Sequence, residues 1–191
     1  MKRLHTKLHH FNASYSWCWW VGRGCLAGPV VASAVILKKN ILGLDDSKKL
    51  SPKKRKELAE IIIENSYFSY GFASQQEIDD INILQASLLA MKRAILNLTV
   101  KPDKVLVDGT HKPNIELPVQ TIIGGDSLIA EISAASIIAK VYRDNLMKEI
   151  DSNYPNYGFA KHKGYGTKFH LEAIKLHGPC SIHRKTFKGV I

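Results

Sequence analysis

The sequence predicts an α/β protein in which helices flank a mixed β-sheet, with a small helical segment near the C-terminus. Residues 29–38 form an almost continuous apolar, β-branched run, which is typical of a buried strand. Residues 77–98 and 127–150 repeat apolar side chains every three or four positions, which predicts two long amphipathic helices. Because strand and helix patterns mix without strict alternation, a mixed sheet is favoured over a purely parallel one.

Shorter strands are expected between the helical segments. Residues 67–73 alternate aromatic and small side chains, and residues 119–123 are rich in β-branched side chains. Residues 105–107 form an apolar stretch that ends at Asp108-Gly109, a turn sequence. Residues 13–21 are expected to form one more strand, directly before a glycine-rich turn.

Two further helices are marked by their ends. Ser51-Pro52 combines an N-cap residue with proline at the first helical position, and this helix is expected to reach about Asn65. A short helix over residues 167–177 is stopped by Gly178-Pro179. The expected inner stripe of the helix over 127–150 consists of Leu128, Ile132, Ala135, Ala139, Tyr142, Leu146 and Ile150.

Charge favours a polyanionic partner. The chain of 191 residues has 27 Lys and Arg against 17 Asp and Glu, a net charge of +10. Nucleic acid is therefore the expected partner, and a basic surface without a partner is the alternative. Three widely spaced cysteines form no C-x-x-C pair, so the sequence suggests neither a disulfide framework nor a zinc site, which fits a cytoplasmic location. We expect residues 1–12 to be a basic tail and residues 13–191 to be one monomeric domain. No apolar run approaches the roughly 18 residues of a membrane span.

Two carboxylates follow predicted strands. Asp108 ends the stretch 105–107, and Asp126 follows Gly124-Gly125 at the start of a long helix. The ordinary alternatives are an Asp-Gly turn for Asp108 and an N-cap for Asp126. Two such carboxylates at one sheet edge can instead share a divalent cation, and hard oxygen ligands favour Mg²⁺ or Mn²⁺. Paired ions about 4 Å apart would hold the attacking and leaving oxygens of a phosphodiester in line.

Candidate substrate contacts surround glycines and cations. Gly22-Arg23-Gly24 allows backbone amides to approach a phosphate beside a guanidinium. Lys48 and Lys49 precede a helix start and are candidate phosphate contacts, with a solvated turn as the alternative. Tyr165, between two glycines, can stack on a base or sugar, or pack under a loop. Residues 183–185, His-Arg-Lys, form another basic cluster.

Taken in order, these segments resemble the bacterial ribonuclease HII family, the type 2 ribonucleases H, over about residues 21–188. The matching motifs are GRGCLAGP (22–29), DSKKLS (46–51), EIDDINIL (77–84), VDG (107–109), GDS (125–127), ISAASIIAKVYRD (132–144), HKGYGT (162–167) and HRKTF (183–187).

The resemblance implies a ribonuclease H-like mixed sheet and an endonuclease dependent on Mn²⁺ or Mg²⁺. Its expected substrates are RNA–DNA hybrids and duplex DNA with embedded ribonucleotides, nicked on the 5′ side of the ribonucleotide. By the same resemblance, Asp108 and Asp126 are metal ligands. The turn Gly22-Arg23-Gly24 would read the 2′-OH and phosphate, which is how a protein distinguishes RNA from DNA. Lys48 and Lys49 would contact phosphates, Tyr165 would stack on the neighbouring deoxyribose, and Asp144 is interpreted as structural.

The chain departs from the family pattern immediately before the glycines. The family places Asp-Glu where this chain has Trp19-Trp20, so two of four metal ligands are replaced by indoles, which cannot coordinate a cation through oxygen. As printed, the chain is expected to bind metal poorly and to cleave little, and a catalytically inactive hybrid-binding relic is the alternative function.

An out-of-frame reading explains the double tryptophan. The codons GCT GGT GTT GAT GAA for Ala-Gly-Val-Asp-Glu, shifted by one base, read AGC TGG TGT TGA TGA. With TGA read as tryptophan this yields Ser-Trp-Cys-Trp-Trp, the residues at 16–20. We therefore predict that the segment ending at Trp20 is a frame-shifted active-site strand that returns to frame at Val21, and true loss of the ligands is the rival explanation.

Overall fold

The computed structural model describes residues 14–124 and 129–191 and contains a five-stranded sheet in the order β3-β2-β1-β4-β5. The pairs β1–β2 and β2–β3 are antiparallel, whereas β1–β4 and β4–β5 are parallel. The predicted mixed sheet is thus confirmed. Its strands are β1 (Tyr15–Val21), β2 (Val30–Leu37), β3 (Ser66–Ala73), β4 (Lys104–Asp108) and β5 (Val119–Ile122).

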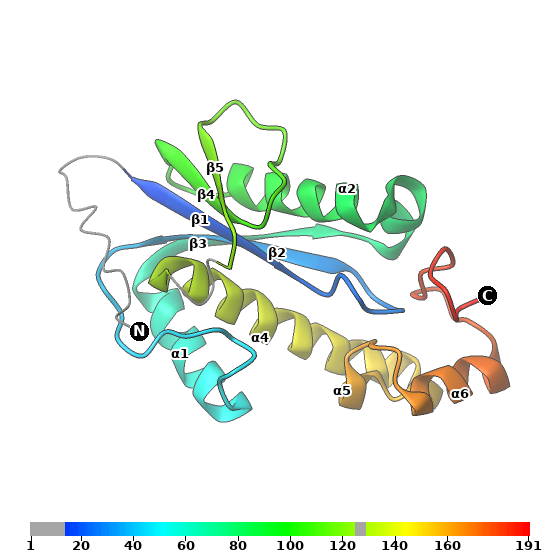
Figure 1. Ribbon diagram of the computed structural model, residues 1–191. Helices are drawn as coiled ribbons and strands as arrows, with labels where there is room; N and C mark the ends of the chain where they lie inside the picture. The colour runs from blue at the N-terminus through cyan, green and yellow to red at the C-terminus, as the bar shows by residue number, and fades with distance from the viewer. Residues whose placement is uncertain (1–13, 125–128) are drawn as a thin grey trace.

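Helices cover both faces of this sheet. Helix α2 lies on one face, and α1 and α4 lie on the other, while the short α5 and α6 extend beyond one end of α4 (Figure 1). The helical elements are α1 (Pro52–Glu64), α2 (Gln75–Leu96), α4 (Ala130–Asn153), the 3₁₀ turn η1 (Pro155–Tyr157), α5 (Phe159–His162) and α6 (Lys168–His177).

Local capping explains where the helices begin. The Ser51 hydroxyl accepts from the Lys54 amide, with Pro52 at the first helical position, as the sequence predicts. Helix α2 begins two residues earlier than the apolar periodicity predicts, because Ser74 and Glu77 form a reciprocal capping box. Inside α2, Asn82 has a positive φ of 67°, and its side chain caps the helical turn that follows.

Strand β1 separates two apolar layers. Trp17 and Trp19 join the core between the sheet and helices α1 and α4. Cys18 points to the opposite core, under α2, where burial raises the pKa of its thiol. This alternation follows from the two-residue period of a strand and places consecutive β1 side chains on opposite sides of the sheet.

The buried face of α4 follows the predicted stripe in the first half of the helix and is displaced by one residue from position 142 onward. Ile132, Ala135 and Ala139 are buried as expected, but Tyr142 is exposed. Arg143 and Met147 are fully buried instead, four and eight residues after Ala139. The helix therefore turns a cation inward toward the loop that follows β1. Within residues 14–124 and 129–191, every helix is too short or too polar to cross a lipid bilayer.

Candidate active site at the ends of β1 and β4

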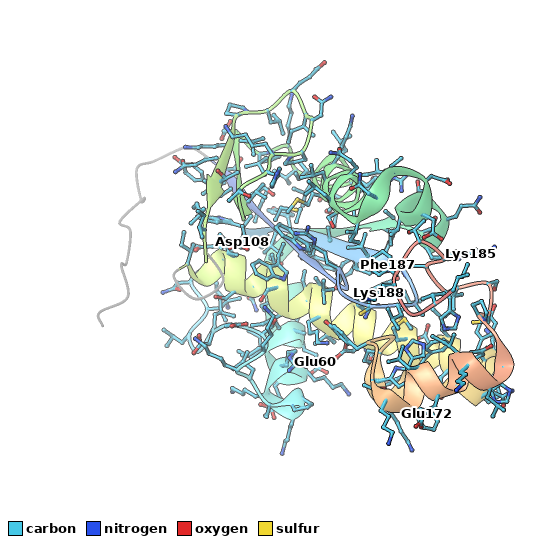
Figure 2. All side chains as sticks on the ribbon, turned by 45° about the vertical axis from the view of Figure 1, so that its right-hand side comes forward. Glu60, Asp108, Glu172, Lys185, Phe187 and Lys188 are labelled. Atoms are coloured by element: carbon cyan, nitrogen blue, oxygen red, sulfur yellow. The ribbon has the colours of Figure 1, made fainter. Side chains whose placement is uncertain are left out.

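Asp108 is the last residue of β4 and is 8% exposed, at one end of the sheet (Figure 2). Strand β1 runs parallel to β4 with Cys18 opposite Val107, so the next position along the two strands brings Trp19 beside Asp108 on the α4 face. The predicted placement of Asp108 at a strand end is confirmed. Asp126, the second predicted ligand, lies outside the described residues.

The two tryptophans lie at the end of β4, Trp19 beside Asp108 and Trp20 beside Gly109. Their rings are stacked with centroids 5.7 Å apart. A methyl group on Gly109 would lie 2.8 Å from the Trp20 ring, so this indole fills the space beside the residue that follows Asp108. Each ring also carries a cation: Arg23 lies 5.6 Å from the Trp20 centroid, and Lys48 lies 5.7 Å from the Trp19 centroid.

Three predicted segments therefore converge on the tryptophans: the turn at 22–24, the lysine turn at 46–50 and the end of β4.

A divalent cation does not fit the donors that the structure describes there. In the described ranges, no three His, Cys, Asp or Glu side chains gather closely enough to hold a metal ion. Indole nitrogens add no ligand, because Nε1–H only donates.

The turn Gly22-Arg23-Gly24 is held from beneath by a buried guanidinium. Arg184 donates to the carbonyl oxygens of Gly22 (2.7 Å), Arg23 (2.8 Å) and Gly28 (2.8 Å from Nη2). In a trans peptide the N–H points opposite to the carbonyl, so the amides of Arg23 and Gly24 face away from Arg184. Apart from Gly24 and its two chain neighbours, no described atom lies within 4 Å of a Cβ built on Gly24, so there is open space at this position of the turn.

A second buried arginine supports the loop that follows the turn. Arg143 of α4 donates to the carbonyls of Ala27 (3.2 Å), Pro29 (3.1 Å) and Lys163 (2.8 Å). Gly22 has a φ of +93°, and a Cβ there would lie 2.2 Å from Arg143 Nε, so glycine is required at this position.

The arginines place positive charge directly under the open amides. Both guanidiniums are fully buried, and their hydrogen bonds go to backbone carbonyls. Burial lowers the pKa of Arg184 to about 10, which still leaves it protonated at neutral pH. Outward amides above buried cations form a local environment that favours an anion.

Only one member of the basic cluster at residues 183–185 is exposed to solvent. His183 and Arg184 are 1% and 0% exposed, and Lys185 alone is on the surface. The segment is attached to α2, where Asp79 accepts from the Lys185 amide (2.8 Å) and the Thr186 amide (3.0 Å). Figure 2 shows Lys185 and Phe187 in this segment, close to α2.

Lys48 and Lys49 are exposed in a turn of defined shape. Asp46 accepts from the Lys48 amide (2.9 Å), and Arg55 donates to the carbonyls of Ser47 (2.8 Å) and Leu50 (2.9 Å). Because Arg55 belongs to α1, this helix holds the turn that places Lys48 over the Trp19 ring.

Asp144 links this turn to the other side of the site. Its carboxylate pairs with Arg55 (3.8 Å) and Lys140 (2.8 Å), which supports the interpretation of Asp144 as structural. Lys140 Nζ lies 5.8 Å from the ring of Tyr165, which is 41% exposed. Tyr165 also bridges to Cys25 in the loop after β1, and burial raises the pKa of its hydroxyl.

Arg143 and Arg184 are the residues that sequence reasoning missed. The four-residue spacing from Ala139 to Arg143 could have placed Arg143 on the inner face of its helix. Nothing local marks Arg184, because its partners lie about 160 residues earlier in the chain.

Comparison with known proteins gives a consistent assignment. Residues 20–190 match the family model for ribonuclease HII. Ribonuclease HII of Chlamydia abortus is 53% identical over 174 residues, covering 89% of this chain and 82% of the relative. Ribonuclease HII of Vibrio parahaemolyticus is 56% identical over 173 residues, with the same coverage of both chains. The crystal structure of ribonuclease H2 from Pyrococcus horikoshii OT3 superposes with a TM-score of 0.76 at 27% identity, covering 93% of this chain and 95% of that one. The chain therefore belongs to the ribonuclease HII family.

Proposed function

We propose that this protein has an endoribonuclease fold and works as a cytoplasmic monomer on RNA–DNA hybrids and on duplex DNA with embedded ribonucleotides. With a complete set of metal ligands, this fold would nick the DNA duplex on the 5′ side of the ribonucleotide. Membership of the ribonuclease HII family supports the reaction class. The observation that carries the proposal is the convergence of the turn at 22–24, the turn at 46–50 and Asp108 at one end of the sheet.

Substrate recognition is assigned to three features. The outward amides of Arg23 and Gly24 bind the phosphate and 2′-OH of the ribonucleotide, above the buried arginines. Lys48 and Lys49 contact phosphates farther along the duplex. Tyr165, exposed and next to the same loop, stacks on the neighbouring deoxyribose.

Cleavage is proposed to require carboxylates that this strand lacks. In a two-metal mechanism, Asp108 and Asp126 would hold Mn²⁺ or Mg²⁺ together with acidic residues at positions 19 and 20, and the ions would stabilise charge at the phosphodiester. Here those positions carry stacked indoles covered by cations. The chain as printed is therefore proposed to bind hybrids without efficient cleavage, which is also the second candidate function.

The out-of-frame origin of residues 16–20 gains support from packing. Ser16 Oγ is buried with no hydrogen-bond partner in the described part of the chain, a cost that a native strand seldom carries. The family match itself begins only at residue 20. Resequencing tests this: an uninterrupted frame with TGG codons at positions 19 and 20 contradicts it.

Cleavage and binding assays separate the two functions. The parent protein, with Trp19 and Trp20, and a Trp19→Asp/Trp20→Glu variant are each incubated with Mn²⁺ and a DNA duplex containing one ribonucleotide. We expect both proteins to shift the duplex in a gel, because phosphate contacts supply much of the affinity, and only the variant to nick it. Robust nicking by the parent protein would contradict the need for carboxylates at these positions. Absence of binding by both proteins would contradict the proposed function.

A further inference from the structure

Two buried histidines meet behind the exposed Tyr165. His170 of α6 and His183 of the C-terminal segment are 0% and 1% exposed, with their Nε2 atoms 3.0 Å apart. A hydrogen bond between two imidazole nitrogens needs one protonated and one bare nitrogen, so the two rings must hold different roles.

Backbone contacts decide which ring donates. The Cys180 amide donates to His183 Nδ1 (2.9 Å), so His183 carries its proton on Nε2. His183 then donates to His170 Nε2, which leaves the His170 proton on Nδ1. That Nδ1–H donates to the carbonyl oxygen of Tyr165 (2.9 Å). A single direction of hydrogen bonding therefore runs from Cys180 to Tyr165.

Neighbouring groups keep the pair neutral. His162 stacks on His170 with ring centroids 4.4 Å apart, and the Gly164 amide donates to Nδ1 of His162 (3.2 Å). Burial lowers the pKa of His170 to about 4 and also lowers the pKa values of His162 and His183. Protonation of either member of the pair would set two N–H groups against each other.

We propose that His170 is a positioning residue for Tyr165, with its tautomer set by His183. The inference rests on the substrate-stacking role proposed for Tyr165. The Tyr165 carbonyl accepts from the Thr167 amide (2.8 Å) as well as from His170, so the residue is held through its backbone while its ring stays exposed. The histidine pair thus connects the C-terminal segment to the orientation of a substrate contact.

Two substitutions of His170 separate positioning from packing. His170→Asn keeps an amide donor at the place of Nδ1, whereas His170→Gln keeps a polar group only at the place of Nε2. We expect His170→Gln to weaken binding of a ribonucleotide-containing duplex by roughly three- to tenfold, the range for one lost hydrogen bond, and His170→Asn to bind like the parent. In a Tyr165→Ala background the two variants should no longer differ in binding, because the side chain that His170 positions is then absent.

Side-chain ¹⁵N NMR of the parent provides a readout that needs no substrate. We expect Nδ1–H at His170 and Nε2–H at His183, and a shift of the Tyr165 carbonyl resonance in His170→Gln but not in His170→Asn. An Nε2–H tautomer at His170, or equal effects of the two substitutions on the carbonyl, would overturn the positioning role. If the parent does not bind the ribonucleotide-containing duplex more tightly than an all-DNA duplex, the proposed function is contradicted. The tautomer measured at His170 would still decide whether His170 positions Tyr165.

Discussion

Replacing Trp19 and Trp20 with Asp and Glu should convert a metal-insensitive protein into one that Mn²⁺ stabilises. Trp19 is 9% exposed in the core beneath α1 and α4. Truncating a buried tryptophan costs about 3–5 kcal/mol of unfolding free energy, and new carboxylates beside Asp108 add repulsion. Without a cation, the double variant should therefore unfold at a clearly lower temperature than the parent.

Mn²⁺ should reverse much of this loss. A ligand present at 100 times its Kd adds about 2.7 kcal/mol to the unfolding free energy. For a chain of this size, 1 kcal/mol corresponds to roughly 2–4 °C, so the midpoint should rise by about 5–10 °C.

Thermal unfolding followed by circular dichroism, with and without Mn²⁺, measures this difference. Trp19→Asn/Trp20→Gln is the matched control, because it has similar volume to the acidic variant but no added charge. Neither this control nor the parent should respond to Mn²⁺ by more than about 1 °C, which is less than 1 kcal/mol. An equal response in all three proteins, or no response in the acidic variant, would refute the assignment of positions 19 and 20 as missing ligands.

Three further predictions concern stability. Ser16→Ala should raise the unfolding free energy in urea by about 1 kcal/mol, because it removes a buried hydroxyl without a partner in the described ranges; a decrease would contradict this. His170 has a pKa of about 4 in the folded state against about 6.5 unfolded, so its contribution is complete above pH 6.5 and up to about 3 kcal/mol is lost as the pH falls to 4. Urea unfolding between pH 7 and 4 should show this slope in the parent and a shallower one in His170→Asn. Hydrogen bonding to Arg93 lowers the pKa of Glu77 to about 2, so the pair stabilises above about pH 4.5 and weakens toward pH 2. Because both side chains are partly exposed, Glu77→Gln should cost less than about 1 kcal/mol in thermal unfolding at pH 7.

The elements that the sequence predicted well depend on local information. The run at 29–38 forms β2, and the stretch before Asp108 forms β4, because β-branched apolar residues in sequence already describe a buried strand. The position of Asp108 followed from that strand end alone. The apolar pattern predicts the start of α2 two residues too late, because Ser74 caps the helix through its side chain before the apolar pattern begins.

The support of the substrate turn could not be predicted in the same way. Arg184 lies in a basic run that is typical of a surface, yet it is buried by carbonyls from residues 22–28. Its environment depends on contacts across nearly the whole chain, which periodicity does not report. The exposed Tyr142 and buried Arg143 show the same limit, because the rotation of α4 is set by the loop it packs against.

The attachment of Arg184 to the turn after β1 also orders events during synthesis. Residues 22–24 leave the ribosome among the first, but the side chain that fixes their carbonyls is added about 160 residues later. Contacts of such long sequence separation form late, because closing the intervening loop is entropically costly. The sheet can therefore assemble while the turn at 22–24 is still unformed. A nascent or C-terminally truncated chain should then have a folded sheet but bind nucleic acid poorly.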